Sequence, residues 1–364
     1  MRWIPLGQVN ASMKNPTTSK RRKEVAGPMV HQPVSLKQIA AHLGLNPATV
    51  SVVLNDVPGR TIPQVTRDRI KAAAREMNYQ PNLLARSLRN RQTQTIGILL
   101  PELGDGYHTQ VMSGIGDQLI KAGYLYFTAH HRHRKNLVED YTRTLIGRGA
   151  QGIIAVDTLL EHPIPVPVVA VAGHRHIKGV TNVVLNHARA AEYALTYLYS
   201  LGHRKIAFMR GQPFSSDSDQ RWGGLVAVAK DLNLTINPEL VVSLDRDLTS
   251  PELGYPVVQQ LIATKQPFTA LVAFNDISAI GSIRALRDFH LRVPQDVSVI
   301  GFDNISASAY TLPRLTTISQ PLEEIGRIAT QSLLDRMHNI EISSDEIIVE
   351  PELVIRESTG PVKL

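Results

Sequence analysis

Residues 35–55 read SLKQIAAHLGLNPATVSVVLN, and this stretch decides how the N-terminal part of the chain folds. Ser35 followed three residues later by Gln38 is the pattern of a capping box, and apolar residues then recur at the spacing of one helix face. Gly44 can take the left-handed conformation that ends a helix, and Asn46 suits the cap of the next helix. Two helices joined by so short a turn predict a helix-turn-helix.

A third helix is predicted after this pair. Thr61 and Gln64 fit a capping pattern, and Pro63 suits a first turn. Apolar residues at helical spacing supply the predicted buried face: Ile70, Ala73, Ala74 and Met77. The segment 83–88 also favours a helix but is barely two turns long, and such a helix is marginal in water unless something docks against it.

Positive charge is concentrated at the start of the chain. The whole chain has a net charge of +7, yet residues 1–95 hold 15 Lys and Arg against 4 Asp and Glu, which is +11, and the remainder is −4. A basic head on a mildly acidic body is typical of a module that binds a polyanion, joined to a part with another task. A basic tail that only keeps the chain soluble is the alternative on charge alone.

Composition excludes several classes of protein. The 364 residues, 43% of them hydrophobic, can bury a core in roughly two to three domains. Cysteine is absent, which excludes disulfides, a thiolate nucleophile and Cys-ligated metal centres. No apolar run approaches the length of a membrane span, and the first residues lack the apolar region of a signal peptide. We therefore expect a soluble, cytoplasmic protein without membrane contact, with Met13 and Met29 as possible later translation starts.

After residue 95, strand-like apolar runs alternate with amphipathic helical patterns. This alternation is typical of βαβ units, whose parallel sheets are covered by helices on both faces. The residues alone leave open one large sheet or two smaller ones. The predicted strands are 95–100, 152–156, 168–171, 205–209, 270–274 and 297–301. The predicted helices are 110–122, 188–201, 221–232, 254–264 and 277–289.

Six further motifs follow in order between residues 78 and 321: NYQPNLLARSL, TIGILLP, SLGHRKIAFMRG, LVAFNDISAIGSIRAL, VPQDVSVIGFDN and LPRLTTISQP. Together with the opening stretch they resemble the LacI/GalR family of bacterial transcriptional repressors. The resemblance runs from about Val34 to the C-terminus, so it is far more specific than a lone helix-turn-helix.

The resemblance implies an all-α helix-turn-helix headpiece and an α/β, two-lobed effector domain similar to periplasmic binding proteins, with two doubly wound parallel sheets. It also implies a homodimer on a pseudo-palindromic double-stranded DNA operator, and a small-molecule effector between the lobes that alters operator affinity. The implied parts are a disordered basic arm at 1–33, the headpiece at 34–82, a hinge helix and linker at 83–94, and the effector domain at 95–364. Lobe one would hold 95–185 and 321–350, and lobe two 186–319 and 351–364.

In a helix-turn-helix the second helix enters the major groove with its first residues at the base edges. Pro47, Ala48 and Val52 match the family's base-contacting positions, and none of them can donate a side-chain hydrogen bond. We therefore expect apolar contacts, for example with thymine methyl groups, with Asn46 and Lys37 as nearby polar candidates. Family positions near the phosphates are Ser35, Thr49, Ser51 and Asn55, for which helix surface and capping are the alternative.

The hinge segment carries three further candidates for DNA contact. Arg86 and Arg89 are expected at phosphates. Leu88 resembles the leucine that the family wedges into the minor groove, where an apolar side chain can unstack a base step. Packing against the effector domain is the alternative for Leu88. A helix that orders only on DNA would give the effector a physical switch.

The effector is expected outside the C-terminal ends of strands, as in other doubly wound sheets. The family positions that line this site are Tyr107, His108, Arg221, Asn275, Asp276 and Asp303. An arginine with a carboxylate and an amide suits vicinal hydroxyls or a carboxylate group. A structural ion pair between Arg221 and Asp303 is the alternative.

The chain departs from the family pattern at several positions around this site. Ala172 and Gly173 stand where many sugar-responsive members carry an acid, and Thr249 stands near the position of the sugar-stacking aromatic, with only Tyr255 close by. Three prolines in residues 157–167 oppose a helix that is usual in the first lobe. The resemblance implies a sugar or a related metabolite as effector, but these departures weaken the case for a standard hexose and leave a small acid, a sugar phosphate or a purine as alternatives.

Other motifs carry less weight. The histidines at 130–133 and 174–176 are expected in a solvated or cleft-edge role rather than as metal ligands, and Trp222 is expected to pack in a helix. No nucleotide-binding or catalytic motif is found, so we expect no cofactor, no metal and no enzyme activity. A carbohydrate-metabolising enzyme with an appended basic domain, and a solute-binding protein for transport, are the alternatives.

Overall fold

The computed structural model describes residues 34–56, 59–80, 92–104, 106–173, 176–245, 250–340 and 344–363. The chain divides into two compact units, residues 1–82 and 83–364, each considered by itself below. Among the described residues, no helix combines the length and the apolar character that crossing a bilayer requires.

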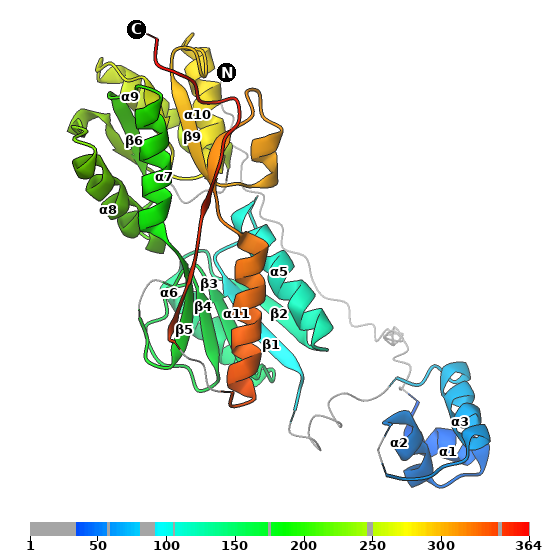
Figure 1. The fold of residues 1–364 in the computed structure, drawn as a ribbon. Coiled ribbons are helices and arrows are strands. Elements are labelled where there is room, and N and C mark those ends of the chain that lie inside the picture. The colour runs from blue at the N-terminus through cyan, green and yellow to red at the C-terminus, as the bar shows by residue number, and fades with distance from the viewer. Residues whose placement is uncertain are drawn as a thin grey trace, which may run out of the picture. The chain divides into compact units, whose positions relative to one another are not determined.

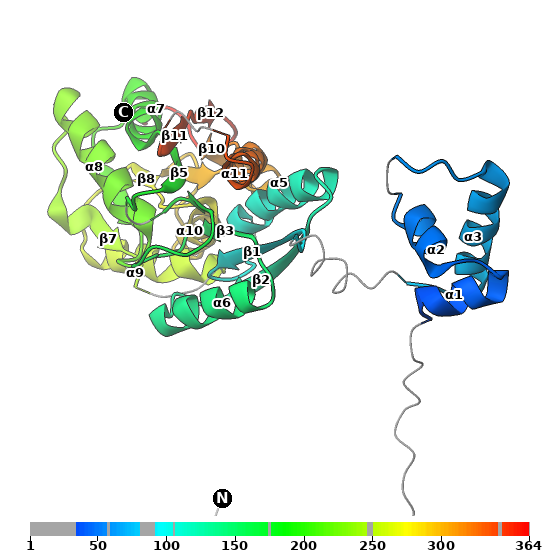
Figure 2. The same cartoon turned by 90° about the horizontal axis from the view of Figure 1, so that it is seen from below.

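The first unit is a three-helix headpiece (Figure 2). Its helices are α1 (Leu36–Leu43), α2 (Pro47–Leu54) and α3 (Gln64–Glu76). The predicted capping box of α1 is confirmed, because the Ser35 hydroxyl accepts from the Gln38 amide while the Gln38 side chain accepts from the Ser35 amide. Gly44 has a φ of 65° and Asn46 caps α2, so the predicted turn is confirmed as well.

The headpiece core contains one correction to the predicted buried positions and one to the predicted caps. Met77, predicted on the buried face of the third helix, is only half-buried, whereas Val50 and Val53 of α2 are fully buried. Helix α3 begins after Pro63 without a side-chain cap, so the predicted capping by Thr61 and Gln64 is wrong. The Gln64 amide group instead donates to Asp68 within the same helix.

The first lobe of the second unit is built on a six-stranded sheet (Figure 1). Its strand order is β11-β5-β4-β3-β1-β2, and every neighbouring pair is parallel. The strands are β1 (Thr95–Leu100), β2 (Leu125–His130), β3 (Gly152–Val156), β4 (Val168–Val171), β5 (Val180–Leu185) and β11 (Glu346–Val349). Its helices are α5 (Tyr107–Lys121), α6 (Lys135–Gly147) and α11 (Leu322–Met337).

The second lobe repeats this strand order with β12-β10-β9-β8-β6-β7, in which only the β10–β12 pair is antiparallel. The strands are β6 (Ile206–Arg210), β7 (Val241–Ser243), β8 (Ala270–Val272), β9 (Ser298–Asp303), β10 (Thr316–Ser319) and β12 (Glu352–Val354). Its helices are α7 (His187–Ser200), α8 (Ser216–Asp231), α9 (Gly254–Ala263) and α10 (Asp276–Asp288). Two sheets, rather than one large sheet, therefore answer the question that the residues left open.

The six predicted strands and five predicted helices of this unit are all present, with ends shifted by a few residues. The predictions did not include the helices α6 and α11, the inner strands β5 and β10, or the strands β2, β7, β11 and β12 at the sheet edges. Strand β2 shows why, since it lies at the sheet edge and most of its residues are exposed or half-buried. Such a strand lacks the continuous apolar run that marks a central parallel strand.

The chain passes between the two sheets three times. It leaves the first sheet after β5, returns between β10 and α11, and leaves again between β11 and β12. The first and third passages contact each other, because the Asn186 side chain donates to the Glu350 carboxylate at 3.0 Å.

The connection between β3 and β4, residues 157–167, contains no helix, as its three prolines predicted. In the second lobe the equivalent connection, between β8 and β9, contains α10. Helix α6 of the first lobe is therefore flanked by an irregular segment.

Candidate functional site

A cavity lies between the two lobes, at the C-terminal ends of their strands. It has a volume of about 800 Å³ including its open mouth. Polar and aromatic side chains from both lobes surround it, as expected for a site at which a small polar molecule is held by fixed donors and acceptors. The lining residues are Tyr107, His108, His133, Asp157, Ala172, Gln212, Phe214, Ser215, Asp217, Arg221, Phe274, Asn275, Ile277, Asp303 and Gln320.

Arg221 of α8 is held firmly in the wall of this cavity. Its side chain is 7% exposed, and its guanidinium lies 3.5 Å from the centre of the Phe302 ring and 4.5 Å from that of Phe274. One terminal nitrogen donates to the Phe274 carbonyl and the other to Asp217 at 3.3 Å. The buried Nε has no hydrogen-bond partner among the described residues. A buried donor without a partner is costly, so a ligand atom that accepts from Nε would be favoured.

Asp217 is the carboxylate that pairs with Arg221, one helical turn earlier on α8. His187, the first residue of α7, lies 3.5 Å from its other oxygen. Burial alone would raise the pKa of Asp217, but the His187 and Arg221 charges outweigh it and hold this pKa below its usual value. The expected alternative of an Arg221–Asp303 ion pair is therefore wrong, since Asp217 takes that place.

Asp303 lies at the end of β9 and is 5% exposed. It accepts a hydrogen bond of 2.7 Å from Gln320, which sits where the chain returns to the first lobe. Burial raises the pKa of Asp303 to about 7 despite the nearby Arg221 charge and the Gln320 hydrogen bond. Asp303 can thus accept hydrogen bonds from a ligand as a carboxylate, or donate one when protonated.

Asp276 does not line the cavity, and its predicted role as a contact for the effector needs correction. It is fully buried at the start of α10, where its carboxylate accepts from the Thr317 hydroxyl at 2.6 Å and from the Ile305 amide at 3.0 Å. Burial and the charge of Asp303 raise its pKa to about 8. Asp276 supports the cavity wall from behind, and its neighbour Asn275 lines the cavity while capping α10 through the Ser278 amide.

The first lobe contributes Tyr107 and His108, the first two residues of α5. Their rings meet edge to face at 5.2 Å, and His108 Nε2 lies 3.8 Å from an Asp157 oxygen. Burial, followed by the charges of Asp217, Asp157 and Asp303, raises the pKa of Tyr107 well above its usual value. The Tyr107 hydroxyl is therefore a permanent donor near the carboxylates of the second lobe.

An aromatic contact joins the two lobes at the cavity. The His133 ring, from the loop after β2, lies 4.4 Å from the Phe214 ring, which follows β6. Tyr255, the aromatic that the sequence suggested, is not among the lining residues; its hydroxyl donates to Asp288 at 3.1 Å. Thr249 lies outside the described residues. Phe214 thus supplies an aromatic wall from a different loop.

Five of the six predicted effector residues line the cavity, and Asp276 does not. Sequence reasoning missed Asp157, Asp217, Phe214 and Gln320, and it placed the 130–133 histidines only at a cleft edge. One signal was available for two of them, because Asp157 directly follows β3 and Phe214 lies in the loop after β6, and loops after strands gather at one edge of a sheet. Trp222 packs against Phe208 at 5.8 Å within the second-lobe core, as expected.

On the headpiece, the predicted base-contacting residues are accessible. Pro47 and Ala48 are exposed in the first turn of α2, and Val52 is half-buried one turn further on. Lys37 and Asn46 are exposed, and the Asn46 carbonyl oxygen accepts from the Ala48 amide at 2.8 Å. These positions remain a prediction for DNA contact.

The predicted phosphate-contacting residues also have structural roles. Ser35 caps α1, and the Asn55 amide donates to the Ser51 carbonyl at 2.8 Å and to its hydroxyl at 3.2 Å. Thr49 is half-buried. Capping and phosphate contact are compatible, since each hydroxyl has two acceptor lone pairs and a rotating proton. Arg86, Leu88 and Arg89 lie outside the described residues.

Comparison with known proteins agrees with this architecture. Residues 35–82 match the family model described as bacterial regulatory proteins, lacI family, and residues 195–359 match a periplasmic binding protein-like domain. The HTH-type transcriptional repressor PurR of Aliivibrio fischeri (strain ATCC 700601 / ES114) is 31% identical over 334 residues, which are 90% of this chain and 98% of that protein.

Two solved structures resemble the fold. The lac repressor dimer bound to operator and the anti-inducer ONPF has a TM-score of 0.80 at 24% identity, covering 90% of this chain and 100% of that one. A LacI-type regulator from Alkaliphilus metalliredigens complexed with D-xylulofuranose has a TM-score of 0.66 at 26% identity, covering 73% and 99%. The headpiece, the paired sheets with a cavity between them and the match along nine-tenths of the chain lead to one conclusion: the chain belongs to the LacI family of bacterial regulatory proteins.

Proposed function

We propose that the protein is a transcriptional repressor that binds a specific double-stranded operator, and that a small molecule in the inter-lobe cavity sets its affinity for that operator. The observation that carries this proposal is a polar cavity lined by both lobes, in a chain that also bears an exposed helix-turn-helix. A ligand that contacts both lobes favours the arrangement in which both contacts are made, and so can bias a two-state domain.

The cavity favours a sugar or a related polyhydroxylated metabolite as effector. Asp217 and Asp303 offer acceptors for ligand hydroxyls, and Tyr107 and the Arg221 Nε offer donors. The apolar faces of Phe214 and Phe274 can pack against the carbon face of a ring.

We further propose that the protein acts as a homodimer, as the lac repressor in the similar structure does. Apolar side chains that would be costly to leave in water supply a surface on each lobe. On the first lobe, Ile120, Leu125 and Phe127 are 69%, 65% and 49% exposed, and β2 is an edge strand. On the second, Tyr310 and Leu312 are 86% and 88% exposed. A second copy related by a two-fold axis would match a pseudo-palindromic operator.

DNA contact is assigned to the predicted headpiece and hinge residues, with Pro47 and Ala48 at base edges and Leu88 in the minor groove. Leu88→Ala is expected to weaken specific binding while leaving nonspecific binding and global stability nearly unchanged, because a wedge acts only on a deformed duplex. Gel shifts with operator and with random DNA measure both quantities. Equal loss of the two kinds of binding would contradict the wedge.

The decisive experiment for the repressor function is a gel shift of the full chain against genomic fragments at physiological salt. The protein is expected to shift at least one fragment selectively, and the absence of any selective shift would contradict the proposal. Because the relatives are repressors, we also propose that the cavity binds its ligand without converting it and that the protein works in the cytoplasm, where its DNA is. Turnover of a metabolite by the purified protein would revive the enzyme alternative.

Thermal-shift screening of sugars and other metabolites identifies the effector, since a ligand that binds only the folded state raises the melting temperature. Tyr107→Phe removes one donor from the cavity and is expected to reduce the shift given by the effector. Tyr193→Phe, on the exposed side of α7, is the matched control. A shift of equal size in both variants and the wild type would show that the ligand binds elsewhere.

A further inference from the structure

A second cavity lies on the first lobe, away from the inter-lobe site. It has a volume of about 1200 Å³ including its open mouth, and it is bounded by α6 and by the irregular segment 159–165. Its floor is apolar, with Val138, Ile146 and Ile164 among the lining residues. The cavity exists because the connection between β3 and β4 has no helix to cover this side of α6.

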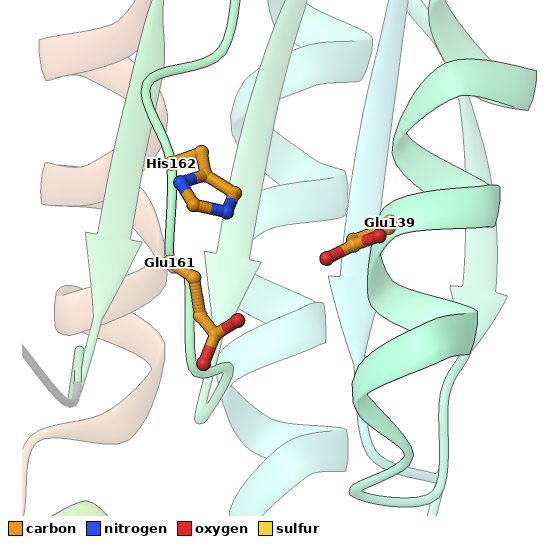
Figure 3. A group of neighbouring side chains, drawn as sticks. All are labelled: Glu139, Glu161 and His162. Carbon is orange, nitrogen blue, oxygen red and sulfur yellow. The ribbon is translucent and has the colours of Figure 1, made fainter.

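Three side chains able to ligate a metal gather at this cavity. Glu139 extends from α6, while Glu161 and His162 lie on the facing segment (Figure 3). One ligand atom of each lies within 4.8 Å of the other two. Ligand atoms around a tetrahedral zinc ion stand roughly 3.3 Å apart, given metal–ligand distances of about 2.0–2.2 Å. Glu139 and His162 are exposed and Glu161 is half-buried, so changes of rotamer on the two facing segments can close that difference.

We propose that Glu139, Glu161 and His162 bind a divalent transition-metal ion of the Zn²⁺ type. An imidazole with two carboxylates suits Zn²⁺ and its neighbours, whereas Mg²⁺ and Ca²⁺ favour oxygen ligands alone. Three protein ligands would leave the fourth position of a tetrahedral site to water. The proposal does not depend on the proposed function, because this cavity shares no residue with the inter-lobe site.

Lys135 allows a test of whether metal affinity rises or falls when a neighbouring positive charge is removed. Its ammonium lies 2.5 Å from a Glu161 carboxylate oxygen, and it stands one helical turn before Glu139 on α6. A metal ion bound to Glu161 competes with this ammonium for the same oxygens and is repelled by its charge. Neutralising Lys135 is therefore expected to tighten metal binding. If the cluster served only to form the Lys135–Glu161 ion pair, the same change would not tighten metal binding.

Metal binding would tie two parts of the first lobe together. Val138 on α6 and Leu160 on the segment belong to the same apolar cluster beneath the cavity. A metal ion that bridges the two segments acts only on the folded chain, so it raises the melting temperature in proportion to the logarithm of its free concentration.

The experiment is calorimetric titration of the full-length protein with ZnCl₂, together with melting curves in ZnCl₂ and in MgCl₂. The chain has 13 histidines, so the site is read from differences between variants. His162→Ala is expected to lose one zinc equivalent per chain, Glu139→Gln to weaken that equivalent at least about tenfold, and Lys135→Gln to tighten it several-fold. ZnCl₂ should raise the wild-type melting temperature and MgCl₂ should not.

Asp140→Asn, next to Glu139 on α6, and the exposed His338→Ala are matched controls that should bind zinc as the wild type does. All five substitutions change exposed side chains, and circular dichroism verifies that each variant folds. Unchanged stoichiometry and affinity in His162→Ala would overturn the site. Weaker binding in Lys135→Gln would overturn it as well, because the ion pair would then be the reason for the cluster.

Discussion

The two lobes share a strand order but close their sheets differently. In the second lobe the connection from β8 to β9 carries α10, which packs against α9 and places Asn275 at the cavity. In the first lobe the equivalent connection is a proline-rich segment that leaves α6 beside an open groove. The buried carboxyls Asp276 and Asp303 occur where the helix covers the sheet. One topology thus builds a wall with buried carboxyl groups in one lobe and an accessible outer surface in the other.

The largest expected effect concerns the two buried carboxyls of the second lobe. Their pKa values rise from 3.8 to about 8 for Asp276 and about 7 for Asp303, chiefly through burial. These pKa values are higher in the folded state than in the unfolded chain. At any pH between the two pKa values of a carboxyl, the folded protein therefore binds more protons than the unfolded chain. The free energy of unfolding therefore falls as the pH rises from about 4 toward 8.

Urea denaturation at a series of pH values measures this slope. Asp303→Asn is expected to flatten it, since the variant removes one titrating carboxyl and relieves the repulsion on Asp276. Asp117→Asn, exposed on α5 of the first lobe, should leave the slope unchanged. If Asp303→Asn and the wild type lose stability equally with rising pH, the Asp303 carboxyl does not contribute to the pH dependence of stability.

The next largest effect concerns the packing of α10. A Cβ placed on Gly281 would lie 1.6 Å from the Pro251 carbonyl oxygen, so backbone must move to accommodate Gly281→Ala. We expect a loss of about 3 kcal/mol in the free energy of unfolding. Gly223→Ala on α8, where nothing lies within 4 Å, is the control and should raise stability by about 0.5–1 kcal/mol. Chemical denaturation distinguishes them, and similar values for both would mean that α10 packs loosely.

A smaller effect is expected at the proposed dimer surfaces, one on each lobe. Tyr310→Asp on the second lobe places a charge at an 86% exposed aromatic, and Phe127→Ser on the first lobe replaces a 49% exposed aromatic with a small polar side chain. Each should weaken dimerisation by roughly 2 kcal/mol, which is about 30-fold in the dissociation constant. Sedimentation equilibrium gives both values and shows which lobe contributes more. A dimer unaffected by either change would mean that the copies meet through other surfaces.

Much of the fold could be predicted from the sequence because its signals are local. The Ser35–Gln38 box, Gly44 and Asn46 each act within four residues, and the central strands are continuous apolar runs. Edge strands such as β2 could not be predicted in this way, because half of their residues face solvent.

The candidate site could be predicted only in part. Arg221 and Asp303 are found through the family motif, but the motif cannot show that Asp217 is the partner of Arg221 or that Asp276 turns inward to Thr317. These facts depend on the packing of α8 and α10 against the sheet. The contact between His133 and Phe214 joins residues about 80 positions apart, which periodicity cannot detect.

The three passages of the chain between the sheets have a consequence for how this domain can be cut. A protease that nicks any one of them leaves the lobes joined by the other two, so limited digestion there should yield fragments that stay associated until denatured. The same threading means that neither lobe corresponds to a continuous stretch of gene. A single truncation or recombination break near residue 186, 320 or 351 therefore cannot produce one intact lobe without part of the other.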